Sequence, residues 1–114
     1  MAELVEILKA LSDESRLKLV ELLLRRDYCV GALAKHLSLS ESAVSQHLKV
    51  LRMADIVKGE KRGYFTHYWV DRDLICRVAE QLKKLSQVQL EVKKCQKNSS
   101  HQDQCCRKEG AKHE

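Results

Sequence analysis

Five cysteines and five histidines are the side chains in this 114-residue chain that are best suited to bind a soft metal ion. Thiolates are soft ligands and prefer soft ions such as Cu(I), Zn, Cd or a trivalent metalloid. Three of the thiols stand near the C-terminus, at Cys95, Cys105 and Cys106. They are the candidate ligands for trivalent arsenic or antimony, and His101 could complete a tetrahedral site for cadmium or zinc. The alternative is a tail with ordinary reduced thiols.

A second candidate site lies on the segment 41–53, where apolar residues recur at helical spacing. Three of them fall on one stripe of a helix by the i, i+4, i+7 rule: Val44, Leu48 and Leu51. Ser42, Gln46 and Lys49 fall on the opposite stripe, and Ser40 stands at the capping position. We therefore expect a helix that packs by one face and presents hydrogen-bonding groups on the other. The alternative is a polar face that is merely solvated.

The remaining pattern predicts a mostly α protein with one small β-hairpin. Apolar spacing indicates helices over 4–11, from Ser12 as an N-cap to about residue 25, and over 30–37. Ile56 and Val57 begin a strand, Lys61-Arg62-Gly63 reads as a turn, and 64–70 reads as the returning strand. Strand alternation places three of its side chains on one face: Phe65, His67 and Trp69.

A last helix is expected from a cap at Asp71 or Asp73 to about Lys97. Five of its residues are spaced 4, 3, 4, 3, the seam of a helix that packs along another helix: Val78, Leu82, Leu85, Gln89 and Val92. The chain has little other core to offer this seam, so the expected partner is a second copy. We expect one domain over 1–98 and a flexible Cys- and His-containing tail over 99–114.

The composition excludes several classes of protein. Hydrophobic residues make up 44% of the chain, which is enough for a core, whereas aromatics are 4% and proline is absent, which disfavours a sandwich or barrel. The net charge of +5 permits contact with a polyanion without proving it. An odd number of cysteines, an acidic start and the lack of a long apolar run lead us to expect a cytoplasmic protein with free thiols.

Two short helices joined by a tight turn, followed by a basic hairpin, form the pattern of a winged helix-turn-helix. The residues Leu11-Ser12-Asp13-Glu14-Ser15-Arg16-Leu17 resemble the L-x-D-x-x-R-L opening of the ArsR/SmtB repressors. The segment 39–52 is similar to that family's recognition helix, and Lys61-Arg62-Gly63-Tyr64 stands where its wing does. The resemblance runs from about residue 5 to residue 92. It implies a homodimeric repressor, joined through its N- and C-terminal helices, that leaves operator DNA when an inducer binds.

The resemblance also implies which residues meet DNA. Four would face base edges: Ser42, Ser45, Gln46 and His47. Ser40 and Lys49 would address phosphate, and Lys61 and Arg62 would approach the minor groove with Tyr64 beside them. The chain departs from many relatives at position 41, where an acid, Glu41, replaces glutamine. This acid is expected to serve the helix N-terminus rather than a base.

Two sensor sites of the family are incomplete in this chain. The segment 27–33 lies where arsenic-sensing relatives carry E-L-C-V-C-D-L, but only Cys29 matches, because Gly31 replaces the second cysteine. Cys29 is therefore a weaker candidate ligand and is expected to be a half-buried structural residue. The zinc site of other relatives needs histidines where this chain has Ser86 and Gln89. Cys76 is expected to serve packing.

The sequence thus predicts a repressor released by a soft metalloid, arsenite or antimonite first, at Cys95, Cys105 and Cys106. A rival within the same fold is a thiol-redox or persulfide sensor that joins two cysteines on oxidation. An architectural DNA binder without an inducer is another alternative. A thiol enzyme such as a small arsenate reductase is disfavoured, because the loop after Cys29 lacks the glycines and arginine of an anion cradle.

Overall fold

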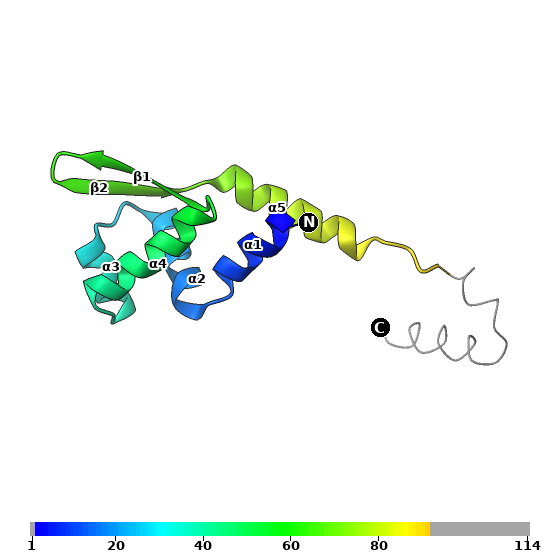
Figure 1. Ribbon diagram of the computed structural model, residues 1–114, viewed down its shortest axis with the longest axis horizontal. Helices are drawn as coiled ribbons and strands as arrows, with labels where there is room; N and C mark the ends of the chain where they lie inside the picture. Colours follow the sequence, from blue (N-terminus) through cyan, green and yellow to red (C-terminus); the bar gives the residue numbers. More distant parts are fainter. Residues whose placement is uncertain (1, 92–114) are drawn as a thin grey trace. The chain divides into compact units, whose positions relative to one another are not determined.

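The computed structural model describes residues 2–91, which form five α-helices and one two-stranded antiparallel sheet (Figure 1). The winged helix-turn-helix expected from the sequence is confirmed. Within this range no helix is long and apolar enough to cross a membrane. In chain order the elements are α1 Ala2–Leu11, α2 Glu14–Arg25, α3 Val30–Leu37, α4 Glu41–Met53, β1 Val57–Arg62, β2 Phe65–Val70 and α5 Arg72–Ser86.

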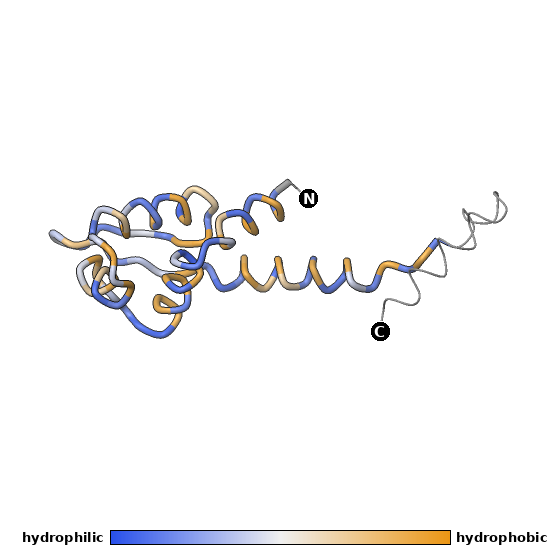
Figure 2. Tube along the Cα trace, turned by 90° about the horizontal axis from the view of Figure 1, so that it is seen from below, coloured by the Kyte–Doolittle hydropathy of each residue, from blue (hydrophilic) through white to orange (hydrophobic). Residues whose placement is uncertain are grey.

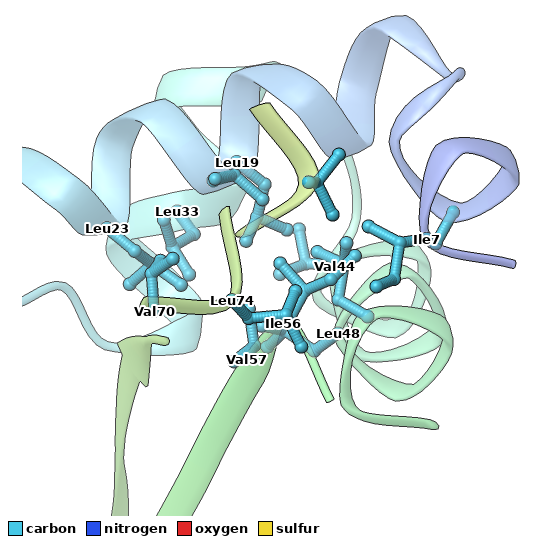
Figure 3. Packing of buried hydrophobic residues seen from close by; sticks show 14 of the residues in the cluster. Ile7, Leu19, Leu23, Leu33, Val44, Leu48, Ile56, Val57, Val70 and Leu74 are labelled. Atoms are coloured by element: carbon cyan, nitrogen blue, oxygen red, sulfur yellow. The ribbon is translucent and has the colours of Figure 1, made fainter. Parts of the chain in front are cut away.

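The core is aliphatic and receives side chains from all seven elements (Figure 3). On α4, the stripe expected to pack is buried: Val44, Leu48 and Leu51 are 0%, 2% and 0% exposed. These residues lie in one cluster with Leu19 of α2 and Leu33 of α3. The 3.6-residue period of α4 therefore fixes which side of this helix faces solvent.

A tight turn joins α3 to α4. Ser38 closes α3 in the left-handed conformation, at φ 57° and ψ 44°, and the backbone N–H of Leu39 donates to the carbonyl of Ala34 at 3.0 Å. The hydroxyl of Ser40 then accepts a hydrogen bond from the backbone N–H of Ala43 at 3.1 Å. The expected Ser40 cap and the expected extent of this helix are both confirmed.

The cap of α2 differs from the expectation by one residue. Asp13, not Ser12, has the extended backbone of an N-cap, and its carboxylate accepts from the backbone N–H of Arg16 at 3.0 Å. Ser12 instead donates its hydroxyl to the carbonyl of Lys9 at the end of α1. Both residue types cap well, so the choice depends on how the chain leaves α1.

The hairpin pairs β1 with β2 from Val57 opposite Val70 to Arg62 opposite Phe65. The turn is Gly63–Tyr64, and Gly63 has a φ of +66°, a conformation that glycine adopts without strain. Lys61 and Arg62, expected in the turn, are therefore the last residues of β1. The register places Phe65, His67 and Trp69 on one face as expected, and the rings of His67 and Trp69 stack with centroids 5.5 Å apart.

Helix α5 is capped as expected but ends early. The carboxylate of Asp71 accepts from the backbone N–H of Leu74 at 3.1 Å. The helix ends at Ser86, not near residue 97, and the backbone N–H groups of Gln87 and Val88 bond three residues back. Figure 2 shows apolar and polar residues alternating along α5. The 4, 3, 4, 3 seam is thus only partly helical here, because Gln89 follows the helix and residue 92 lies outside the described range, as does the boundary expected at 98/99.

The buried stripe of α4 makes a testable prediction about folding. We expect Leu51→Ala to lower the free energy of unfolding by about 2–5 kcal/mol, through lost burial and the cavity left behind. The matched control on the same helix is Met53→Ala, because Met53 is 76% exposed. Its effect should stay below about 0.5 kcal/mol. Chemical denaturation at one protein concentration measures both; equal effects would contradict this packing.

Candidate nucleic-acid interface

The outward face of α4 carries four exposed polar residues, Ser42, Ser45, Gln46 and Lys49. None of their side chains forms a hydrogen bond or ion pair with another residue of the described range. The core stripe on the opposite side of α4 keeps them turned to solvent. The structure therefore brings four of the expected DNA contacts together on one unpartnered face, with donors and acceptors available to a ligand.

Ser40 lies at the N-terminal end of the same helix. Its oxygen accepts the capping bond from Ala43, while its hydroxyl hydrogen remains available to a phosphate oxygen. The carboxylate of Glu41, in the first turn of α4, lies close to α3, because a Cβ added at Gly31 would be only 3.3 Å from its oxygen Oε2. The acid that departs from the family pattern thus lies against α3.

His47 does not share the exposed face with Gln46. It is half-buried, and its Nδ1 lies 3.4 Å from Nη1 of Arg16 on α2. Successive residues of a helix point about 100° apart, so His47 faces the side of α4 that packs toward α2. The expectation that His47 faces base edges together with Ser42, Ser45 and Gln46 is not supported by this geometry.

The wing carries the remaining expected contacts. Lys61 and Arg62 are exposed and, as neighbours on a strand, point to opposite faces of the hairpin. The guanidinium of Arg62 lies 3.5 Å from the carboxylate of Glu60. Tyr64 is 99% exposed at the tip. Two cations and an aromatic ring thus project from the hairpin, which extends beyond the helices (Figure 1).

A groove of about 580 Å³ separates the C-terminal half of α4 from the hairpin. Three cationic side chains line it, from Lys49, Arg52 and Lys58, together with Trp69 and with Asp55, whose carboxylate lies 3.6 Å from the ammonium of Lys58. The sequence reasoning did not assign Arg52 or Lys58 to the site. The i, i+3 spacing of Lys49 and Arg52 was an available signal, whereas Lys58 reaches the groove only because β1 folds back beside α4. Three cations against one carboxylate leave the groove with a net positive charge, which suits an anionic backbone.

The candidate sensor residues are not assembled within residues 2–91. Here no three His, Cys, Asp or Glu side chains converge to hold a metal ion. Cys29, expected to be half-buried, is exposed at the N-cap position of α3, and Cys76, expected to pack, is exposed on α5. The packing expected for Cys76 is therefore not found within one chain. Cys95, His101, Cys105 and Cys106 lie outside the described residues.

Comparison with known proteins identifies relatives of this chain. The family model of the "bacterial regulatory protein, arsR family" matches residues 13–58. The transcriptional repressor SdpR of Bacillus subtilis is 34% identical over 62 residues, which cover 54% of this chain and 69% of SdpR. The arsenical resistance operon repressor of Staphylococcus xylosus is 32% identical over 80 residues, which cover 70% of this chain and 77% of that repressor.

The solved structures include a similar fold. An ArsR-like transcriptional regulator from Rhodococcus sp. RHA1 superposes with a TM-score of 0.68 at 30% sequence identity. The match covers 75% of this chain and 80% of that structure.

Ser40 allows the capping role to be separated from contact with DNA. Asp caps a helix as well as Ser does, so Ser40→Asp should leave the free energy of unfolding unchanged, but its carboxylate should repel phosphate and weaken DNA binding. Ser40→Ala, the matched variant, should cost about 1 kcal/mol of stability through loss of the cap. Chemical denaturation and DNA-binding titration measure the two effects. Wild-type DNA affinity in Ser40→Asp would show that this residue is remote from the backbone.

Proposed function

The chain belongs to the arsR family of bacterial regulatory proteins, and we propose that it is a homodimeric repressor that leaves its operator when a soft metalloid binds cysteine thiolates. The family consists of transcriptional regulators rather than enzymes, and this chain is thus a transcriptional regulator. The proposal covers the operator contacts, the dimer and the inducer. The inducer proposed first is arsenite or antimonite, and cadmium or zinc is proposed second.

The observation that carries the proposal is the unpartnered polar face of α4 beside a basic wing. An α-helix fits the major groove, where Gln46, Ser42 and Ser45 would hydrogen-bond base edges. Lys49 and Arg52 would contact phosphates across the groove between α4 and the hairpin. The wing would place Lys61 and Arg62 at the minor groove. Base contacts supply sequence preference, and the cations supply a salt-dependent contribution to affinity.

Exposed apolar side chains support the dimer. Val5 and Leu8 of α1 are 49% and 36% exposed, and Leu82 and Leu85 of α5 are 41% and 54% exposed. Apolar surface that recurs along a helix and stays exposed in one chain is typical of an interface. A second copy joined through α1 and α5 would bury these residues and present two copies of α4 to a two-fold symmetric operator.

The inducer is argued from ligand chemistry. Trivalent arsenic and antimony favour thiolates, and the similar protein of Staphylococcus xylosus is an arsenical resistance operon repressor. We assign the sensor to Cys95, Cys105 and Cys106, because three thiolates suit trivalent arsenic or antimony. Binding there would favour a dimer geometry that mismatches the operator. Such coupling is typically about 1–3 kcal/mol, or about 5–150-fold in DNA affinity.

The proposal predicts which cysteines the response needs. With an operator duplex selected from a random library, arsenite should release wild-type protein in a fluorescence-anisotropy titration. Changing Cys95, Cys105 and Cys106 together to Ser should abolish release and leave arsenite-free affinity unchanged. Cys29→Ser and Cys76→Ser are the controls and should respond as wild type does.

Two results would contradict this sensor. Release that persists in the triple variant would exclude the three cysteines. Release by mild oxidation without metalloid, accompanied by a disulfide in the mass spectrum, would favour a redox sensor of the same fold.

A further inference from the structure

The motif at the start of α2 contains two charged residues that the proposed function leaves unused, Asp13 and Arg16. Arg16 is half-buried and lies away from the exposed face of α4. Its placement is specific: the side chain reaches two elements besides its own helix. Arg16 therefore lies next to the helix proposed to read DNA, in a position where it can influence how that helix is oriented.

Three contacts define the position of Arg16. Its Nε donates to the carbonyl of Ala10, near the C-terminal end of α1, at 2.6 Å. Its Nη1 lies 3.4 Å from Nδ1 of His47 on α4. Its backbone N–H donates to the Asp13 carboxylate at 3.0 Å. One side chain thus connects α1, α2 and α4 in the region where these helices pack together.

The chemistry of these contacts requires arginine. A guanidinium has several donors in a rigid plane, so Nε and Nη1 can address different partners at once, which the single ammonium of lysine cannot reproduce. A guanidinium has no acceptor, so in this contact Nδ1 of His47 accepts. The hydrogen bond from the Arg16 backbone holds the pKa of Asp13 below its ordinary value, and the positive charge of Arg16 lowers it further. Asp13 therefore stays anionic and offsets the charge of the guanidinium.

We propose that Arg16 is a positioning residue for DNA recognition, which fixes through His47 how α4 presents Gln46 relative to α1. The inference rests on the proposed DNA-binding function. His47 directly follows Gln46, so a tether on His47 restricts rotation of α4 about its axis. Because α1 carries part of the exposed apolar surface assigned to the dimer, the same tether relates the two copies of α4 to the interface. His47 is thereby an anchoring residue of α4, not a reader of bases.

The test compares binding to an operator duplex with binding to a scrambled duplex, using the full chain. Arg16→Met should weaken operator binding about tenfold, within the usual range of coupling between sites. Scrambled-duplex binding should change less than about twofold, because non-specific binding depends on phosphate contacts that remain. A role in stability alone would lower both affinities together. Arg25→Met is the matched control, because Arg25 lies on the same helix and pairs only with Glu21 in the described range.

Variants of His47 complete the experiment. His47→Leu removes the acceptor and should reproduce the loss seen in Arg16→Met. His47→Asn keeps an acceptor near the position of Nδ1 and should retain operator affinity to within about threefold, since the contact is preserved. The double variant Arg16→Met with His47→Leu should be no weaker than either single variant, because both remove one link. If Arg16→Met fails to fold, the two His47 variants still test whether the contact between Arg16 and His47 contributes to operator binding.

Specific outcomes would overturn the inference. Losses that add in the double variant would mean that the two residues act independently. A salt slope reduced by about one in Arg16→Met would mean that this residue contacts phosphate directly. Changed base preference in His47→Asn would make His47 a reader of bases. Wild-type protein that does not distinguish the operator from the scrambled duplex would overturn the proposed function as well, whereas each of the other outcomes would leave it standing.

Discussion

Helix α4 can bury only one of its faces, and the rest of the molecule depends on which face that is. Val44, Leu48 and Leu51 lie in the core against α2 and α3, where each is almost fully excluded from water. If α4 turned its polar face toward the core, these aliphatic groups would be exposed to water, and amide and ammonium groups would be buried without partners. Both changes would cost free energy. The core therefore holds Gln46 and its neighbours in solvent, where a ligand can reach them.

The charged side chains around α4 leave more cations than acids beside its exposed polar face. The net charge of +5 is small, so affinity for DNA must depend on where the cations lie rather than on their number. Lys49, Arg52 and Lys58 share the groove between α4 and the hairpin, while Glu41 lies over Gly31 of α3. The acid at the start of the helix thus stabilises the helix N-terminus without standing on the exposed polar face.

Much of the fold could be predicted because its signals are local. The bounds of α4 and its Ser40 cap follow from periodicity and one side chain. The cap of α2 shifts from Ser12 to Asp13 because two good capping residues stand side by side, and only the path of the chain decides between them. The end of helix α5 at Ser86 could not be predicted, because a seam of apolar residues indicates a packing surface and does not indicate where the helix ends.

The site was less predictable because it depends on packing between distant segments. His47 shares the polar character of Gln46, yet it faces Arg16, thirty-one residues earlier. Lys58 and Arg52 meet only where β1 folds back beside α4.

In the function we propose, two copies of α4 read one symmetric DNA site through Gln46. Selection from a random duplex library with the full chain tests it most directly. We expect an enriched inverted repeat, in which Gln46→Ala relaxes the preference at one position of each half-site and leaves the other positions unchanged. No enriched sequence, or an enriched site without two-fold symmetry that Gln46→Ala leaves unaltered, would contradict it.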